Sequence, residues 1–233
     1  MLLSSLVLSF VAQQAPVQLD LPQGLPERFQ TAVEVDGQRV TLQLQRRSLR
    51  AKDFILENSD GPILDIPESR TYFGVIKELP GSAIAASLEP YGLRASIFMP
   101  DDALLRLTPN RVRGNGWHTI AAAEAPPLEM CGIEETPLKK DKLGAGSGNR
   151  SVSVPPPSGG SHYLSPYPWQ WTMRKSRIGF DATYAHWVRE GQTVAGVTAS
   201  VEYQLAENDL VCSRDAMVSY ELTGIVIRQS PFY

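Results

Sequence analysis

A cysteine near the middle of the chain is the strongest candidate for a chemically active residue, because of the residues that flank it. Cys131 lies in the run Pro126-Pro127-Leu128-Glu129-Met130-Cys131-Gly132-Ile133, shortly before a long stretch rich in Gly, Ser and Pro. A thiolate presented in this way could coordinate a metal ion that belongs to another part of a protein. The glycine that follows would let the backbone approach a second surface closely. The run therefore indicates either a thiol directed at a metal or a cysteine with an ordinary structural role.

The remainder of the sequence offers no partner chemistry for that thiol. The three histidines, His118, His162 and His186, are scattered, and no two of them are four residues apart. The sequence contains no His-Glu-x-x-His run, no Gly-x-Ser-x-Gly elbow and no phosphate-binding glycine loop. We therefore expect no catalytic residues and no metal site within this chain.

The second cysteine leaves an alternative open. Cys212 is the only other cysteine, so a single disulfide bridge between Cys131 and Cys212 is possible if the protein is exported. The sequence alone does not decide between this bridge and a free thiol at Cys131.

Composition and the first residues limit the class of protein. The chain has 233 residues, 42% hydrophobic and 20% charged, with a formal net charge of −3, which is globular and argues against nucleic-acid binding. Residues 1–15 begin with an apolar run of signal-peptide length that is too short to span a bilayer. We expect a secreted or periplasmic protein with no membrane partner once this leader is removed. A buried first strand or a mis-assigned start codon is the alternative.

The elements that would carry Cys131 are mostly strands. Short runs of alternating apolar residues, separated by turn formers such as Asp36-Gly37, predict an antiparallel sandwich or barrel between residues 28 and 122. The expected strands cover residues 29–35, 39–44, 53–57, 71–78, 83–88, 93–99 and 104–107.

The pattern changes twice after this region. Residues 143–172 are rich in Gly, Pro and Ser and predict a flexible linker. Beyond it we expect a strand at 174–184, a helix from Gln192 or Thr193 to about Val211, and a strand at 217–228. This order predicts a right-handed β-α-β unit with two parallel strands. Overall the sequence predicts an α+β protein.

The motifs, taken in order, resemble a known family. The run around Cys131 is similar to the cysteine-switch segment of reprolysin-type (adamalysin-like) zinc metalloprotease precursors, which are metzincins, where Pro-Lys-Met-Cys-Gly-Val is typical. Three upstream runs, at residues 70–77, 81–88 and 91–97, look like the pro-region of that family. Residues 177–187, the helix with Asn208, and residues 214–222 are similar to the opening β-α-β of its enzyme domain.

The resemblance implies a latent precursor. The thiolate of Cys131, flanked by Met130 and Gly132, would occupy the fourth position on a catalytic zinc held by three histidines. Residues 16–142 would be the pro-region, and residues 173–233 the start of a truncated metalloprotease domain. Because the sequence lacks His-Glu-x-x-His-x-x-Gly-x-x-His, the zinc would belong beyond Tyr233, and the chain is not expected to be catalytic as it stands. The implied partner is the rest of that domain, or a related protease in trans.

Three further expectations accompany this interpretation. Processing would occur in the linker or at Arg174-Lys175-Ser176-Arg177, although these charges also suit an exposed strand edge. Residues 20–125 would fold alone, whereas strand 218–227 would have an unpaired edge. The alternative function is a secreted, non-catalytic β-domain acting as a binding or inhibitory module, and a truncated gene product without function is a third possibility.

Overall fold

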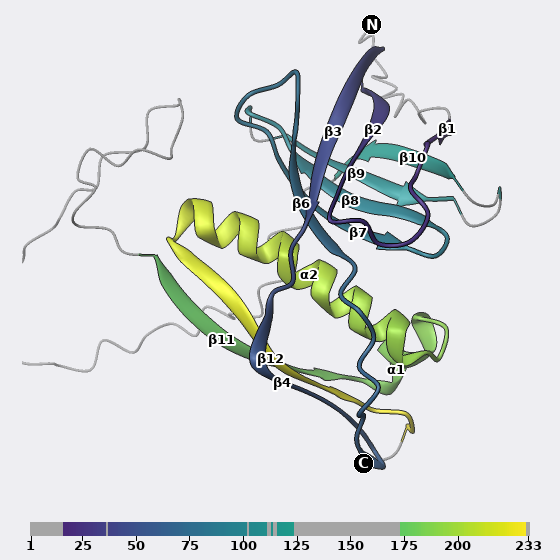
Figure 1. Ribbon diagram of the computed structural model, residues 1–233, viewed down its shortest axis with the longest axis vertical. Coiled ribbons are helices and arrows are strands. Elements are labelled where there is room, and N and C mark those ends of the chain that lie inside the picture. The colour runs from purple at the N-terminus through teal and green to yellow at the C-terminus, as the bar shows by residue number, and fades with distance from the viewer. Residues whose placement is uncertain are drawn as a thin grey trace, which may run out of the picture.

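The computed structural model describes residues 16–35, 37–101, 103–110, 113, 116–123 and 173–231. This part of the chain is mostly β, with an antiparallel sheet that curves into an almost closed barrel, a second smaller sheet, and helices on one side of it (Figure 1). The expected α+β class agrees with this architecture. The predicted leader, the linker and the whole segment around Cys131 lie outside the described residues.

The larger sheet has eight antiparallel strands in the order β1-β10-β9-β8-β7-β6-β3-β2. Its strands are β1 (Val17–Gln18), β2 (Arg28–Val35), β3 (Gln38–Arg46), β6 (Thr71–Ile76), β7 (Ala83–Glu89), β8 (Gly92–Phe98), β9 (Leu104–Pro109) and β10 (Trp117–Ala122). The sequence patterns located most of these strands but missed β1 and β10, which are short or lack a clear apolar alternation.

Alternation of side chains explains the barrel interior. In the β2–β3 hairpin, Val35 pairs with Gln38, so the expected two-residue connection at 36–37 is confirmed, and Gly37 has the positive φ of 76° that this turn favours. Leu42 and Leu44 on β3 point into the barrel, and they are fully or almost fully buried there. The same pattern on the other strands fills the core with Leu, Ile, Val and one tyrosine, Tyr72.

The smaller sheet has four strands in the order β11-β12-β4-β5. They are β4 (Arg50–Asn58), β5 (Gly61–Pro62), β11 (Arg174–Ala182) and β12 (Val218–Ile227), and the helices are α1 (Tyr184–Arg189) and α2 (Val194–Asp215). Strands β11 and β12 are parallel and α2 connects them, so the predicted β-α-β unit is confirmed. Thr193 caps α2 as expected, because its hydroxyl accepts a hydrogen bond from the backbone N–H of Gly196 at 3.0 Å.

Strand β4 corrects two expectations. We expected residues 53–57 to belong to the antiparallel meander, but β4 leaves the barrel and pairs in parallel with β12. The expected unpaired edge of residues 218–227 is therefore wrong, since β12 lies between β11 and β4. Sequence periodicity predicted that residues 53–57 form a strand, but it does not specify which strand they pair with. Helix α1 is a further difference, because a turn was expected there.

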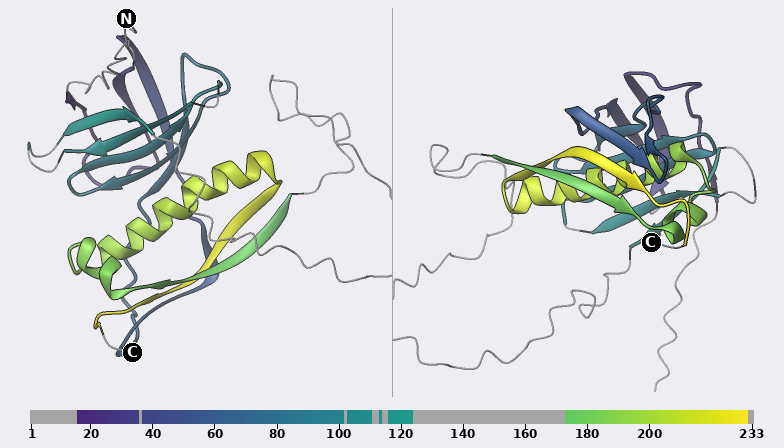
Figure 2. Two further views of the ribbon diagram at one scale, coloured as in Figure 1. Left: turned by 180° about the vertical axis from the view of Figure 1, so that it is seen from behind. Right: turned by 90° about the horizontal axis from the view of Figure 1, so that it is seen from below.

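Helix α2 lies between the two sheets. Figures 1 and 2 show it passing under the barrel while its other side covers the smaller sheet. Val197, Val201 and Leu205 belong to a second apolar core with β11, β12 and Leu56 of β4. No helix in the described part of the chain combines the length and the apolar character needed to cross a bilayer.

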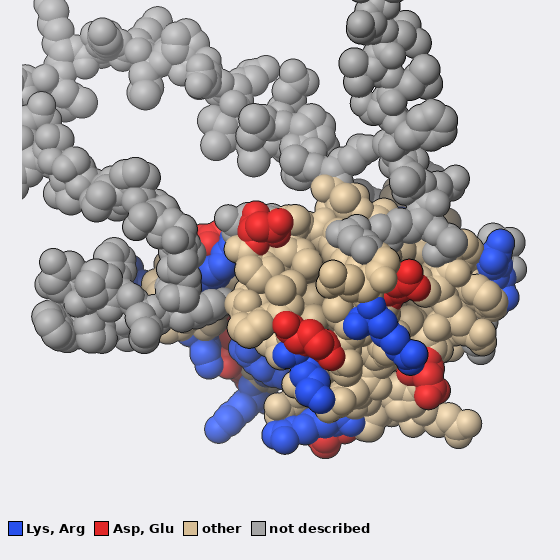
Figure 3. Space-filling view, turned by 90° about the horizontal axis from the view of Figure 1, so that it is seen from above, with Lys and Arg blue, Asp and Glu red and all other residues tan. Residues whose placement is uncertain are grey.

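Basic and acidic side chains are mixed on the surface. On the face seen from above they lie beside one another (Figure 3), as the near-balance of 22 Lys and Arg against 25 Asp and Glu would suggest. Arg46 is an example, because its guanidinium lies 2.7 Å from Glu27 and 2.5 Å from Glu68. Exposed pairs of this kind contribute little to stability, because water screens the attraction between the charges.

Candidate functional site

The side of α2 that faces the barrel is polar and buried, which is unusual for a helix packed between two sheets. Glu202, Tyr203 and Asp209 are each at most 5% exposed. Buried charged groups are costly unless they are paired and hydrogen-bonded. Each of them meets a side chain from the N-terminal strands, and we call this set the α2 interface. Its members are Arg47, Arg50, Arg94, Ser96 and Arg106 from the N-terminal strands and the β3–β4 connection, and Glu202, Tyr203, Glu207 and Asp209 from α2.

The most deeply buried ion pair joins the start of β4 to α2. The Nε of Arg50 donates a hydrogen bond to Glu202, whose side chain is 1% exposed, and Nη1 of Arg50 donates to the carbonyl of Pro67 at 2.7 Å. The guanidinium also lies 5.0 Å from the centre of the Phe54 ring. Burial raises the pKa of Glu202, and the hydrogen bond from Arg50 opposes that rise. Removing one member of such a pair typically costs about 3–5 kcal/mol, because the other charge stays buried without compensation.

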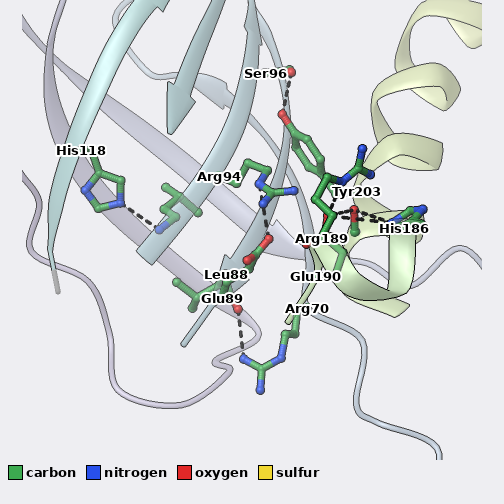
Figure 4. A network of polar contacts seen from close by, with 12 residues as sticks. Arg70, Leu88, Glu89, Arg94, Ser96, His118, His186, Arg189, Glu190 and Tyr203 are labelled. Carbon is green, nitrogen blue, oxygen red and sulfur yellow. Dashed lines mark hydrogen bonds and ion pairs between the residues drawn. The ribbon is translucent and has the colours of Figure 1, made fainter. Parts of the chain in front are cut away.

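A second set of contacts joins the barrel wall to the middle of α2. The Tyr203 hydroxyl lies 2.8 Å from the hydroxyl of Ser96 on β8, as Figure 4 shows. Arg106 on β9 donates to Ser96 at 3.2 Å and makes two hydrogen bonds to Glu207, at 2.6 and 3.1 Å. The guanidinium of Arg94 lies 5.5 Å from the centre of the Tyr203 ring. Burial raises the pKa of Tyr203, so its hydroxyl stays protonated as a hydrogen-bonding group.

Asp209 connects three elements at once. One carboxylate oxygen accepts the backbone N–H of Tyr220 on β12 at 2.7 Å, and the other lies 3.4 Å from the guanidinium of Arg47. Arg47 lies between β3 and β4, and its guanidinium is 4.6 Å from the centre of the Phe73 ring on β6. The corner of the barrel is therefore tied to both the helix and the strand of the C-terminal unit.

A Ser, a His and a Glu meet where α1 turns into α2, but they are not arranged for nucleophilic catalysis. The Ser200 hydroxyl donates to Glu190 at 3.1 Å and lies 3.2 Å from Nε2 of His186. His186 and Glu190 lie close together at this corner (Figure 4). Because the single hydroxyl proton is directed at Glu190, His186 must donate to Ser200 rather than act as its base. Ser200 is also 1% exposed, so no substrate could reach it. The three residues hold the α1–α2 corner together.

The predicted processing residues lie on β11. Lys175 is 3.5 Å from Glu221 of β12, and Arg177 makes contacts of 2.5 and 2.6 Å with Asp53 of β4. Arg174 is the first residue of β11, and Ser176 pairs with Tyr220 of β12. Their use as a cleavage site stays a prediction.

The predicted cysteine-switch residues Cys131, Met130 and Gly132 lie outside the described residues, as does any pairing of Cys131 with Cys212. Cys212 itself is half-buried on α2, and its sulfur accepts a hydrogen bond from the Tyr220 hydroxyl at 3.3 Å. Among the described residues, no group of three His, Cys, Asp or Glu side chains is arranged to hold a metal ion.

Sequence patterns did not reveal the α2 interface. Glu202 and Glu207 lie away from the apolar face of the helix, and in this fold that direction leads to the N-terminal strands and not to solvent. The paired arginines are separated from these acids by about a hundred residues or more, so spacing alone gave no signal.

The sequence matches no protein-family model, and no curated protein is significantly similar to it.

Proposed function

We propose that the chain is the pro-region, with the first β-α-β unit, of a secreted zinc metalloendopeptidase precursor. In this proposal the N-terminal strands keep the enzyme part latent, and Cys131, flanked by Met130 and Gly132, is the ligand directed at the zinc of that enzyme. The sequence holds no His-Glu-x-x-His motif, so the chain contributes the inhibitory part and is not itself catalytic.

The observation that best supports the proposal is the set of specific contacts between the N-terminal strands and the C-terminal β-α-β unit. Strand β4 lies in the same sheet as β12, and arginines from β4, β9 and the segment before β4 bind acids of α2. A pro-region that restrains an enzyme domain must bind it through a specific and well-packed surface. The α2 interface is such a surface, whereas a merely tethered β-domain would not require it.

The order of the family-like motifs supports the same proposal. The runs at 81–88 and 91–97 correspond to β7 and β8, whose outer side chains contact α2, and the run at 177–187 corresponds to β11 and α1. Two segments that resemble a pro-region and an enzyme domain are thus in contact with each other. The zinc, the leader at residues 1–15 and the secreted or periplasmic location belong to the proposal.

An inhibition assay with the chain as it exists tests the role of Cys131. The purified protein is added to an active reprolysin-type endopeptidase under reducing conditions, and cleavage of a fluorogenic peptide is followed. We expect the wild type to inhibit, Cys131→Ser to lose at least about tenfold in inhibitory potency because hydroxyl oxygen is a poorer zinc ligand than thiolate, and Cys212→Ser to inhibit like the wild type.

Two outcomes would count against the proposal. If wild-type protein does not inhibit at all, the latency role is lost. If Cys131→Ser inhibits as well as wild type, the thiol has no part in it, and a non-catalytic inhibitory module becomes the better description.

A further inference from the structure

Strand β4 belongs to the N-terminal part of the chain by sequence and to the C-terminal sheet by hydrogen bonding. The N-terminal part here means residues 16–123, and the C-terminal part means residues 173–231. β4 is reached from β3 through residues 47–49, and the chain returns to β6 after residue 70. Both ends of β4 are therefore anchored in the barrel. The arrangement has the geometry of strand addition, in which one body supplies a strand to the sheet edge of another.

Backbone and apolar contacts fix β4 against β12. The register runs from Ile55 opposite Gly224 to Asn58 opposite Ile227, and the N–H of Leu222 donates to the carbonyl of Leu49 at 2.8 Å. Leu56 is 1% exposed within the second core. A Cβ built on Gly224 would lie 3.0 Å from the carbonyl oxygen of Ile55, so glycine permits this close approach.

Two of the ion pairs that join the parts involve β4, and the surroundings of each decide which of the two contributes more. Asp53 and Arg177 are 69% and 53% exposed, so solvent screens their attraction and the pair contributes little. Arg50 and Glu202 are 15% and 1% exposed, and breaking that pair leaves a charge buried. Arg50 is therefore the polar contact on which the union of the two parts depends most.

The two parts are connected covalently through residues 124–172, a region that contains the linker, one of the two predicted processing sites; the other is Arg174–Arg177 on β11. We propose that cutting the chain within residues 124–172 leaves the N-terminal and C-terminal parts as a stable noncovalent complex, held by β4 and by the Arg50–Glu202 pair and not by Cys131. The biological role of this noncovalent complex rests on the proposed function as a latent precursor. A cut precursor would stay latent until the barrel and β4 are removed together, and their removal would uncover the edge of β12.

A nicking experiment tests the proposal on the complete chain. The recognition sequence of a site-specific protease is placed in the Gly/Ser run at residues 144–148, and the protein is cut under reducing conditions so that no Cys131–Cys212 bridge can hold the fragments. Size-exclusion chromatography with light scattering then measures mass at micromolar concentration. We expect one species with the mass of the uncut chain, and the same result for Cys131→Ser.

Matched variants locate the contact. Arg50→Gln and Lys52→Gln remove the same charge from neighbouring positions of β4, but Lys52 is exposed. We expect Arg50→Gln to raise the dissociation constant of the nicked complex at least about tenfold and Lys52→Gln to change it less than about twofold. Circular dichroism and elution of each uncut variant check the fold. If Arg50→Gln fails that check, Tyr203→Phe, which removes the hydroxyl contact to Ser96, takes its place with an expected rise of a few-fold.

The outcomes of the nicking experiment can be distinguished from those of the inhibition assay, because the nicking experiment contains no zinc enzyme. Separation of the wild-type fragments on nicking overturns the proposal, whatever Cys131 does. Equal dissociation constants for the Arg50 and Lys52 variants overturn the role of the buried pair.

Discussion

The buried side chain of His118 has hydrogen-bond partners that fit only the neutral imidazole. His118 on β10 is 0% exposed, its Nε2 accepts the backbone N–H of Leu93 at 2.9 Å, and its Nδ1 lies 2.9 Å from the carbonyl oxygen of Gly116. The first bond requires a bare Nε2 and the second a protonated Nδ1, so the imidazole is neutral in one tautomer. Burial lowers the pKa of His118 from 6.5, and the Gly116 carbonyl opposes this only in part.

The lowered pKa of His118 predicts a loss of stability in acid. The unfolded chain takes up a proton near its ordinary pKa of 6.5 and the folded barrel does so only at lower pH, so stability is complete above about 6.5 and is lost as pH falls below it. Urea unfolding at pH 7, 6 and 5 should show a fall of up to about 1.4 kcal/mol per pH unit from this residue. His118→Gln, which cannot titrate, should show a shallower fall, while the contributions of His186 and Glu202 are common to both proteins. Parallel curves for the two proteins would contradict this assignment.

At the scale of elements, the outer wall of the barrel is shaped to receive a helix. Ala85 on β7 belongs to the core around α2, while its neighbours Ile84 and Ala86 belong to the barrel interior. Small side chains at Ala85 and Ser96 let α2 approach the sheet closely enough for the Tyr203 hydroxyl to reach Ser96. The alternating small residues at 83–87 therefore reflect packing on two opposite faces of one strand.

Enlarging this wall should separate the helix from the sheet. Ala85→Leu adds three carbons at a position that is 0% exposed, and overpacking of this kind typically costs about 1–3 kcal/mol. Ala121→Leu makes the same change at an exposed position of β10 and should alter the free energy of unfolding by less than about 0.5 kcal/mol. Chemical denaturation of both variants measures the difference. An equal cost at the two positions would show that the wall is not closely packed against α2.

At the scale of the whole molecule, the two halves of the sequence are interleaved. A strand of the N-terminal part completes the C-terminal sheet, and a helix of the C-terminal part lies between the two sheets. Phe54 and Leu56 of β4 pack against the C-terminal part. Independent folding of residues 20–125 stays a prediction, and it would leave these two side chains without that cover. The two parts thus share one continuous set of contacts.

Interleaving predicts a single cooperative unfolding transition. Amide hydrogen exchange followed by mass spectrometry in increasing urea should show β8 and β12 losing protection together. Leu56→Ala, which removes buried apolar atoms at the junction, should lower the stability of both regions by the same amount, about 2–5 kcal/mol. Loss of protection in β12 at a lower urea concentration than in β8 would show two independent units.

Local patterns determined much of this architecture. The apolar residues at 29–35, 39–44, 83–88 and 93–99 form strands because at least one face of each strand meets a core. The β-α-β order after residue 173 follows from the spacing of apolar residues and the Thr193 cap. These features depend on neighbours in sequence, which is why the sequence by itself determined them. The thiol at Cys131 and its proposed metal are likewise an inference from sequence.

Only the tertiary structure decided which elements meet. Strand β4 has an ordinary strand pattern, yet its partner β12 is more than 150 residues away, and no local rule selects that partner. Local sequence patterns also did not indicate that Glu202 and Asp209 are buried. Charged residues on a helix are normally expected to face solvent, and only the packing of another element over them shows otherwise. Pairing and burial are properties of surfaces brought together by the whole fold, so they are determined by the assembled molecule and not by any one segment.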